Sequence, residues 1–497
     1  MIDKVVSSLD EALEGLAPGM KLSVGGFGTC GTPFVLIDGI VERGVGDLEV
    51  YSNNPGTQID ETAMGLSKVV EAGLMRKFCG SFVGFAKALE RQYLTGEIDV
   101  DLIPQGTLAE RMRAGGAGIP AFFTPTGAGS MVSEGGLPIR YDANGNVILR
   151  SEPKETRVFT RPDGTEELCV LEEAITTDFA LIRAHKADRD GNLVFRLTAQ
   201  NMNPSAAMCG KITVVEVEEL VETGELRPEE IHLQGIFVDR ILVLTPEQAA
   251  DKVAERIITR SEDPDDNEPH EALVAKNEHG QPIGWTRAGI AARAAKELKD
   301  GSYVNLGVGI PTSIPDYLPE DVQVVFQSEN GLLKFGPFPL PDEVDADLIN
   351  ASKQTTTLAP GGSTFDSVRS FDMIRGKHVN TAVLGALQVS EKGDIANWGI
   401  PGRKTNGMGG AMDLVKGAQR VIAIMEHLNV HGEHRILKEC TYPLTAAGAI
   451  SLVITNLGVF QVADHGLVLT ELAPGITVED IREYTEPEVH VALDLHN

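Results

Sequence analysis

A single acidic residue, Glu329, stands where a carboxylate could act as a nucleophile. It follows the apolar run VQVVFQ at residues 322–327 and precedes Asn330-Gly331, a pair typical of tight turns. Open parallel sheets place their ligands at the carboxyl ends of strands, and a carboxylate there can attack an activated acyl group such as a thioester. A helix N-cap is the structural alternative, and position alone leaves both interpretations open.

Two glycine-rich segments could hold an anion beside such a carboxylate. GGFGTCGTP at residues 25–33 and KTNGMGG at residues 404–410 each precede a predicted helix, and the second is flanked by the basic Arg403 and Lys404. Backbone N–H groups at a helix start can bind a phosphate or an oxyanion. A turn that needs glycine only for positive φ angles is the alternative. The candidate glycines are Gly25, Gly26, Gly28, Gly407, Gly409 and Gly410.

The first glycine segment also contains a dinucleotide-type pattern. GFGTCG at residues 26–31 matches GxGxxG, which in a nicotinamide-binding fold is followed by an acid at the end of the next strand. Here that strand, at residues 47–52, leads into Asn53-Asn54 instead, and the related loop GVGIP at residues 307–311 lacks the third glycine. The sequence therefore argues against a nicotinamide site.

These candidates lie on an internal repeat, in which each half runs helix, strand, glycine loop, helix, strand and polar turn. The alternation predicts parallel strands with crossover helices. Asn53 and Glu329 occupy matching turns, so the acid is the asymmetric element of a repeated scaffold. The expected helices carry Val6, Leu9, Leu13 and Leu16, then residues 33–43, and in the second half Ile290, Ala294 and Leu298; the expected strands are KLSV, DLEVYS, YVNL and VQVVFQ.

The length and the repeat predict two domains joined by a linker. A chain of 497 residues exceeds what one hydrophobic core usually supports. We expect an α/β fold of two similar, open, mainly parallel-sheet domains with flanking helices, at residues 1–245 and 286–497. Between them lies an acidic linker at 246–285, beginning with the helix-like PEQAADKVAERII and continuing as SEDPDDNEPHE, which predicts a solvated tether.

Composition restricts the partners. The net charge of −29 argues against nucleic acid or an anionic membrane, and an anionic ligand would need a locally basic site. His431 and His434 lack neighbouring acids at metal spacing, so no metal is expected. The five cysteines are scattered, and the start of the chain shows no targeting pattern. These features predict reduced thiols and a cytoplasmic location.

Several longer strings resemble family I of the coenzyme A transferases, the group that contains the succinyl-CoA:3-oxoacid CoA-transferases. The most specific are SENG, GMGGAMDLV and PQGTLAER, and the likeness covers nearly the whole chain apart from the linker. The resemblance implies an α-like part and a β-like part fused in one chain, with Glu329 as the catalytic carboxylate. It also implies that Asn53 or Asn54 and Gln105 bind the acid substrate, and that the glycine segments contact CoA or an oxyanion.

By the same resemblance, CoA moves from succinyl-CoA to a 3-oxoacid such as acetoacetate, in a ping-pong reaction through a thioester on Glu329. CoA is then a substrate, no cofactor is expected, and the partners are acyl-CoA and carboxylic acids, with a homodimer as the expected assembly. A thioester hydrolase, a transferase for acetate or another short acid, and a non-catalytic CoA-binding protein remain alternatives. Phe85-Ala86-Lys87-Ala88 replaces a more polar ENxE-type run of related transferases, which we expect to affect the choice of acid.

Overall fold

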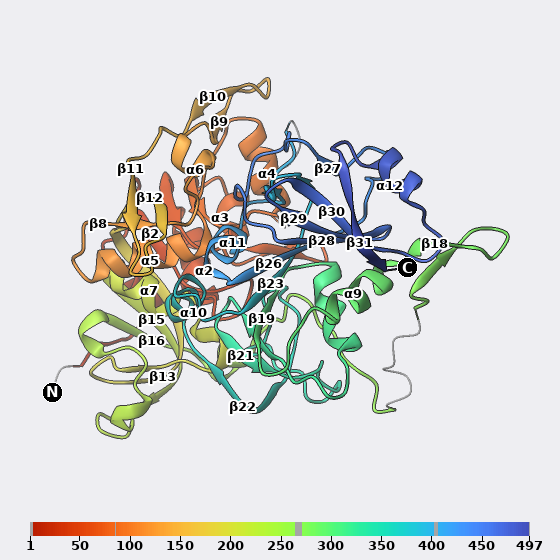
Figure 1. The fold of residues 1–497 in the computed structure, drawn as a ribbon. Coiled ribbons are helices and arrows are strands. Elements are labelled where there is room, and N and C mark those ends of the chain that lie inside the picture. Colours follow the sequence, from red (N-terminus) through yellow and green to blue (C-terminus); the bar gives the residue numbers. More distant parts are fainter. Residues whose placement is uncertain (1–2, 85, 264–270, 402–405, 497) are drawn as a thin grey trace.

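Two large open β-sheets form the centres of the two halves of the chain, with helices on their faces (Figure 1), and the described residues also form five smaller sheets of two or three strands. The computed structural model describes residues 3–84, 86–263, 271–401 and 406–496. Most strand pairs in both sheets are parallel and are connected by crossover segments that contain helices. The predicted α/β class with two similar, mainly parallel sheets is therefore confirmed.

The first sheet has nine strands, and all of its pairings are parallel except that of β13 with β14 (Leu193–Val194). Its order is β1 (Val5–Val6), β16 (Arg240–Val243), β15 (Gly210–Val221), β13 (Thr177–Asp188), β2 (Lys21–Val24), β3 (Leu48–Tyr51), β6 (Met75–Gly80) and β7 (Asp99–Leu102).

The second sheet has ten strands, with a parallel centre and antiparallel pairs toward both edges. Its order is β22 (Leu358–Thr364), β21 (Leu332–Phe335), β20 (Val325–Ser328), β19 (Tyr303–Leu306), β23 (Thr381–Gly385), β26 (Arg420–Met425), β28 (Leu452–Thr455), β29 (Gly458–Ala463), β30 (Gly466–Leu472) and β31 (Val489–His496).

Strand β26 shows why the centre of this sheet reads as a continuous apolar run. Its residues alternate between the two faces, and both faces are buried under helices. Ile422 and Ile424 pack in the core that includes α9 (Arg287–Ala295), whereas Val421 and Ala423 pack in the opposite core with α10 (Ser367–Arg375) and α11 (Ala411–Gly417). The apolar positions predicted for the α9 region are buried as expected.

The internal repeat is visible in the sheet order. Strand β2 lies between β3 and β13, and β19 lies between β20 and β23 in the same arrangement. The crossovers differ: α2 (Phe34–Arg43) is an α-helix, whereas residues Ile310–Tyr317 form a 3-10 helix that contains Pro311 and Pro315. The next strand of each sheet differs as well, because β3 pairs with the parallel strand β6, whereas β20 pairs with the antiparallel strand β21.

The first predicted helix is much shorter than its apolar spacing suggested. Only Leu9–Ala12 form helix α1, and Val6 lies in strand β1, paired with Leu242. Ser8 caps the helix by accepting a hydrogen bond from the Glu11 N–H group. The helical prediction for Val6 was wrong, because an edge pairing with a strand more than 230 residues away competes successfully with local periodicity.

The predicted helix in the linker was also too long. Helix α8 (Pro246–Ala250) stops early, and residues 251–260 run as an extended segment between the two halves. Val253 accepts a hydrogen bond from Thr29 at 2.6 Å, and Ile258 donates one to Thr355 at 3.0 Å. These contacts override helix propensity. Residues 264–270, the centre of the expected solvated tether, lie outside the described residues, and the boundaries at 245 and 286 stay a prediction.

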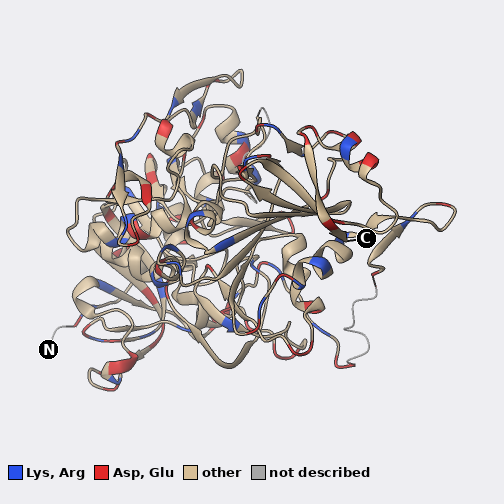
Figure 2. Ribbon diagram, viewed as in Figure 1, with Lys and Arg blue, Asp and Glu red and all other residues tan. Residues whose placement is uncertain are grey.

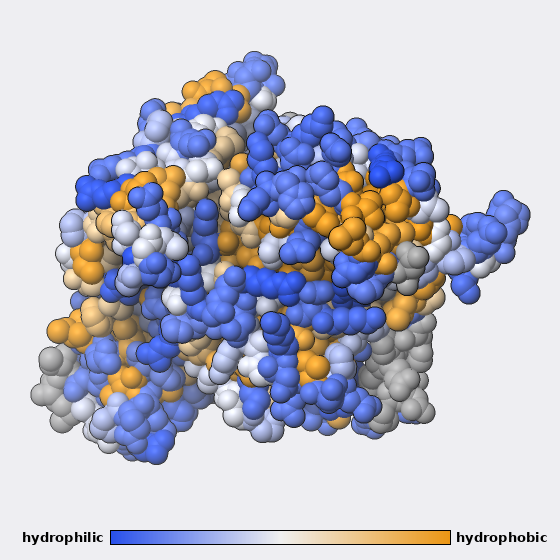
Figure 3. Space-filling view, viewed as in Figure 1, coloured by the Kyte–Doolittle hydropathy of each residue, from blue (hydrophilic) through white to orange (hydrophobic). Residues whose placement is uncertain are grey.

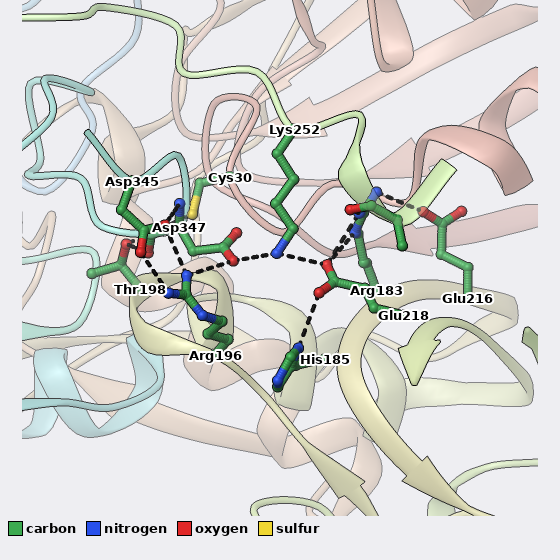
Figure 4. Close-up of polar contacts among 11 residues, drawn as sticks. Cys30, Arg183, His185, Arg196, Thr198, Glu216, Glu218, Lys252, Asp345 and Asp347 are labelled. Carbon is green, nitrogen blue, oxygen red and sulfur yellow. Dashed lines mark hydrogen bonds and ion pairs between the residues drawn. The ribbon is translucent and has the colours of Figure 1, made fainter. Parts of the chain in front are cut away.

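A network of charged side chains holds this segment to both halves (Figure 4). The Lys252 ammonium lies 2.9 Å from Glu218 of the first half and 2.5 Å from Asp347 of the second. Arg196 adds a second connection, with ion pairs to Asp345 at 2.6 Å and to Asp347 at 3.1 Å. The start of the linker is therefore an interdomain clamp.

The surface is rich in charged and other hydrophilic residues, as the composition suggests. Acidic and basic residues are interspersed over both halves in the view of Figure 2. The same face is largely hydrophilic, with apolar areas over the second half near α12 (Val478–Tyr484) and β30 (Figure 3). Among the described residues, no helix has both the length and the apolar character needed to cross a bilayer.

Candidate active site

Glu329 lies in a tight turn between two antiparallel strands. Strands β20 and β21 pair through Ser328 and Leu332, which leaves Glu329, Asn330 and Gly331 as the turn. Gly331 has φ of 108° and donates its N–H to the Ser328 carbonyl at 3.0 Å. A Cβ atom there would lie 1.9 Å from the Phe365 carbonyl oxygen, so only glycine fits. Asn330-Gly331 forms the turn that the sequence predicted.

Two polar side chains of the turn fix it in place. The Ser328 hydroxyl donates to the Asn330 side-chain oxygen at 2.7 Å and accepts the Ala351 N–H at 2.8 Å. The Asn330 amide donates to the Ile349 carbonyl at 2.8 Å. Ser328 and Asn330 are buried, so these bonds replace lost water contacts. Glu329 is thereby held on a rigid support.

The turn opens into a cavity of about 470 Å³ between the two halves. Predicted site residues from both halves meet there: Asn53 and Gln105 from the first half, and Glu329 from the second. The glycines of the segment 406–410 form another part of the wall. The lining includes Phe27, Asn53, Phe82, Gln105, Arg256, Val308, Glu329, Ser352, Lys353, Gly385, Asn397, Trp398, Gly407, Gly409 and Gly410.

The environment of Glu329 disfavours its charge. Burial, and to a lesser extent the negative charge of Asp413, raise the pKa of Glu329, a hydrogen bond from the Gly410 N–H lowers it, and the net value is about 7. Gly410 also has to be a glycine, because a Cβ atom there would lie 2.3 Å from Glu329 Oε2. Its φ is −87°, so close approach to the carboxylate, rather than backbone conformation, requires glycine.

The predicted amides have different surroundings. Gln105 lies on the cavity wall, and its buried Nε2 atom has no hydrogen-bond partner among the described residues. Asn53 also lines the cavity, with its side-chain oxygen accepting from Ser81 at 2.7 Å. Asn54 instead accepts the Gly28 N–H at 2.9 Å and supports the glycine loop from behind. Gln105 therefore keeps a free donor for an anionic ligand.

The first glycine loop packs against protein atoms. A Cβ atom at Gly25 would lie 1.8 Å from Asn203 Oδ1, and one at Gly26 would lie 2.4 Å from the Thr32 hydroxyl. At Gly28 it would lie 2.5 Å from a Glu255 carboxylate oxygen. The cavity lining includes Phe27 from this loop but none of these three glycines. These three glycines permit close packing of the loop. The sequence alone could not distinguish a glycine needed for packing from one that binds an anion.

The second glycine segment fits the prediction more closely. Gly407, Gly409 and Gly410 all line the cavity, with φ of 96° at Gly407 and 50° at Gly409. The Gly409 N–H is already used, because it donates to the Ser81 carbonyl at 3.0 Å. This segment therefore offers the Gly410 N–H as its donor to Glu329. Arg403 and Lys404 lie outside the described residues.

Two basic residues of the cavity wall were missed by sequence reasoning. Lys353 is buried, lies 2.9 Å from Glu255 and sits 5.3 Å from the centre of the Phe82 ring. Arg256 comes from the linker segment. Arg256 supplies local positive charge of the kind that an anionic ligand requires in an acidic protein, whereas the charge of Lys353 is balanced by Glu255. Neither occurs in a motif, so only the folded chain reveals them.

In the segment 85–88, where the sequence differs from the polar run of related transferases, the described residues do not lie where a segment in contact with the substrate would be expected. Phe85 lies outside the described residues. Ala86 and Ala88 are buried in the apolar core of the first half, at the start of α4 (Lys87–Leu94), and do not line the cavity. The effect of residues 85–88 on the choice of acid stays a prediction. Ala86 and Ala88 do not contact the cavity, so such an effect would have to be indirect for these two residues.

Comparison with known proteins identifies the class. The family model described as coenzyme A transferase matches residues 6–244 and 287–484. A solved acyl-CoA transferase from Escherichia coli O157:H7, YdiF, covers 99% of this chain and 95% of its own with a TM-score of 0.72, at 21% identity. The match to the family model shows the family, and the likeness to the solved structure shows the fold.

Curated relatives give the same class over the whole length. The mouse protein named succinyl-CoA:3-ketoacid coenzyme A transferase 2A, mitochondrial, is 45% identical over 481 residues, 96% of this chain and 87% of its own. Two bacterial relatives are separate subunits of probable transferases of the same name. The one from Mycobacterium bovis is 51% identical over 48% of this chain, and the one from Bacillus subtilis is 50% identical over 42%. The chain therefore belongs to the coenzyme A transferase family. It is a CoA transferase in which two parts, separate in these bacterial relatives, are fused.

The same comparison corrects the predicted location. The mouse relative, which covers nearly the whole chain, is named mitochondrial, which contradicts the cytoplasmic location predicted from the sequence. The prediction was wrong because the scattered cysteines and the lack of a recognised targeting pattern do not identify a compartment. The five cysteines are free, and free thiols are compatible with any reducing compartment. The predicted homodimer stays a prediction.

Proposed function

We propose that this protein transfers CoA from succinyl-CoA to a 3-oxoacid such as acetoacetate, through a thioester on Glu329. One observation carries the proposal: Glu329 is held on a tight turn in an interdomain cavity that it shares with Gln105, whose Nε2 atom has no hydrogen-bond partner among the described residues. The pair of acids is supported by the name of the mouse relative, a succinyl-CoA:3-ketoacid coenzyme A transferase.

The proposed reaction proceeds by acyl exchange. A Glu329 carboxylate oxygen attacks the thioester carbonyl, the C–S bond breaks, and CoA thiolate leaves a mixed anhydride on the enzyme. The thiolate then attacks the Glu329 carbonyl carbon, and the first acid departs as a carboxylate with the electron pair of the broken C–O bond. The second acid reverses both steps. Each step exchanges one acyl derivative for another, so the proposal needs neither ATP nor a metal.

Gly410 has a specific part in this scheme. Its N–H now donates to the Glu329 carboxylate. When thiolate attacks the Glu329 carbonyl, that oxygen becomes an oxyanion, and the same N–H can stabilise it without moving far. A preorganised donor of this kind contributes about 3–4 kcal/mol in comparable sites. The interdomain cavity also limits the access of water, which would hydrolyse the thioester.

A groove suited to the rest of the CoA molecule continues from the cavity. The cavity shares Val308, Gly385 and Asn397 with a second hollow of about 220 Å³. That hollow shares Arg287 and Glu426 with a third, of about 620 Å³. Val308, Gly385 and Glu426 follow or end strands β19, β23 and β26, so the groove runs past the carboxyl ends of neighbouring parallel strands.

The far end of the groove has the chemistry of a nucleotide site. Arg287, at the N-terminus of α9, is exposed, and its side chain makes no ion pair or hydrogen bond within the described part of the chain. Trp285 and Tyr484 line the same hollow. A free guanidinium and a helix N-terminus suit the phosphates of CoA, and aromatic side chains suit its adenine. The groove therefore supports a long acyl-CoA thioester with its reactive end at Glu329.

Isotope exchange tests the proposal. With labelled succinate and unlabelled succinyl-CoA, and no second acid, a ping-pong transferase incorporates label into succinyl-CoA. We expect this exchange in the unchanged protein and its loss in Glu329→Gln, with acetoacetate accepting CoA when it is added. No exchange, or free CoA produced at a rate independent of any acceptor, would identify a hydrolase or a binding protein and contradict the proposal.

A further inference from the structure

Asp413 is a fully buried carboxylate that joins the two halves behind the active site. It lies on α11 of the second half and has no exposed surface. Its two oxygens accept hydrogen bonds from the first half, one from the Gly106 N–H at 2.9 Å and one from the Thr126 hydroxyl at 3.0 Å. Asp413 is not one of the described residues that line the cavity.

The peptide group of Gly106 is held from its other side as well. Arg375, at the end of α10, donates to the Gly106 carbonyl at 3.2 Å. The neighbouring Gln105 N–H donates to the Gly409 carbonyl at 2.9 Å. A Cβ atom at Gly106 would lie 2.3 Å from Asp413 Oδ1, so the fit excludes any larger residue. The first turn of α5 (Gln105–Gly116) is thus locked to the second half.

This lock is placed where the two halves of the site meet. Gln105, which begins the locked turn, presents its unpartnered amide in the cavity. On the other side of the contact, Gly409 accepts the Gln105 N–H and the next residue, Gly410, lies against the Glu329 carboxylate. A shift of the α5 turn would therefore change the distance between the donor of one half and the nucleophile of the other. Asp413 is connected to both groups without touching the cavity.

We propose that Asp413 is a positioning residue that holds Gln105 opposite Glu329, and that its buried negative charge favours the acylated forms of Glu329 over the free carboxylate. The inference rests on the proposed thioester mechanism and extends it to a residue outside the cavity.

The second part follows from charge. Gly410, which lies against the Glu329 carboxylate, is the N-cap of α11, and Asp413 lies in the first turn of that helix, so free Glu329 carries its negative charge near that of Asp413. The anhydride and thioester of Glu329 are neutral. Acylation therefore relieves a repulsion that is strong where water is excluded. The raised pKa of Glu329 has the same cause, in addition to burial. The pKa of Asp413 is raised to about 6 by burial, against the opposing effect of Arg375, so both groups are ionised near pH 8.

The other charged groups around the pair are cations, two of which are themselves paired with carboxylates. Arg375 of α10 faces Asp413, and its guanidinium is shared with Glu110 of α5 at 3.6 Å. On the cavity side, Arg256 and Lys353 line the same wall as Glu329, and the ammonium of Lys353 is paired with Glu255. These cations are present whether Glu329 is free or acylated, so they do not remove the difference that Asp413 makes.

Two variants separate charge from position. Asp413→Asn keeps the shape and an acceptor for Gly106 but removes the charge. We expect the acidic limb of the pH profile of kcat/KM for succinyl-CoA to move down by about one pH unit, and the equilibrium fraction of enzyme–CoA thioester to fall about tenfold. Asp413→Ala removes the charge and also the contact to Gly106. We expect KM for the acid acceptor to be about tenfold higher in Asp413→Ala than in Asp413→Asn.

Controls keep both parts testable. Asp464→Asn changes an exposed residue in the turn between β29 and β30 and should leave every readout unchanged. If Asp413→Ala does not fold, Arg375→Met removes the other contact to Gly106 and should likewise raise KM for the acid. An unchanged acidic limb and thioester fraction in Asp413→Asn would overturn the charge role. An unchanged KM in the folded position variants would overturn the positioning role. Absence of thioester in the unchanged protein would instead reject the proposed function.

Discussion

Gly410 and Glu329 are in such close contact that one determines what the other can do. A Cβ atom on Gly410 would lie 2.3 Å from Glu329 Oε2 and 2.8 Å from the carboxyl carbon. The Gly410 N–H also donates to this carboxylate. The glycine thereby leaves room for the carboxylate and supplies the donor that would stabilise charge on its oxygen during attack.

This relationship predicts a large effect of a single methyl group. Gly410→Ala should force the Glu329 side chain away from its present position and weaken the Gly410 hydrogen bond. We expect kcat to fall about 100-fold or more, as when an oxyanion donor is removed. Gly46→Ala is the matched control, since its Cβ would meet the nearest atom at 3.6 Å, an ordinary contact. Steady-state kinetics of both variants decide this, and a kcat near normal in Gly410→Ala would contradict the assigned geometry.

The unpartnered amide of Gln105 predicts a binding defect. Gln105→Leu removes the Nε2 donor, and we expect KM for the acid acceptor to rise about tenfold or more, with a smaller change in thermal stability. Gln92→Leu is a useful contrast, because Gln92 donates to the Val70 carbonyl at 2.8 Å inside the first half. It should lower the melting temperature and leave KM unchanged. The reverse pattern would show that Gln105 is structural.

The raised pKa of Glu329 predicts the pH dependence of activity. Only the carboxylate form can attack a thioester, so kcat/KM for succinyl-CoA should fall about tenfold per pH unit below pH about 7. A profile of kcat/KM between pH 5 and pH 9 tests this. If the acidic limb instead lay at the ordinary glutamate value, the buried environment described for Glu329 would be wrong in solution.

The same shift predicts that the catalytic residue lowers stability. Because the folded-state pKa of Glu329 exceeds its unfolded value of 4.5, the folded protein binds more protons between these values and loses stability as pH rises through that window. Glu329→Gln removes this loss. At pH 8 we expect its free energy of unfolding to exceed that of the unchanged protein by about 2–3 kcal/mol, with the difference vanishing below pH about 4.5. Glu479→Gln, at an exposed position of α12, should show no such trend.

The interdomain clamp predicts a salt-sensitive contribution to stability. Lys252→Met leaves Glu218 and Asp347 without their shared cation, and we expect a loss of about 2–3 kcal/mol in the free energy of unfolding. Lys392→Met, at an exposed position 4.0 Å from Glu439, should cost less than about 0.5 kcal/mol. Chemical denaturation at low and high salt measures both. Equal costs would show that residues 251–260 do not hold the halves together.

Much of this site could be predicted from the sequence because its parts have local signatures. The apolar run before Glu329, the Asn330-Gly331 turn and the glycines before α11 each reflect backbone geometry that a few residues determine. The parallel order of the strands followed from their alternation with helices. The repeat then placed Asn53 and Glu329 in matching turns, and the structure brings both to one cavity.

The rest depended on contacts between distant segments. Arg256 reaches the cavity because the linker lies between the halves, and Lys353 comes from the segment between β21 and β22 of the second half. No local pattern marks either residue. The early end of α8 has the same origin, since residues 251–260 exchange helical hydrogen bonds for contacts with both halves. Gly25 and Gly410 have the same residue type, yet one makes room for Asn203 and the other for Glu329.

The most direct test of the account is the covalent state of Glu329. The protein is incubated with succinyl-CoA in the absence of an acceptor, and the adduct is trapped with borohydride or hydroxylamine before peptide mapping by mass spectrometry. We predict modification of Glu329 in the peptide that contains Ser328-Glu329-Asn330-Gly331, and none in Glu329→Gln. Label on another residue, or no label during active transfer, would contradict the glutamyl thioester and with it the central claim.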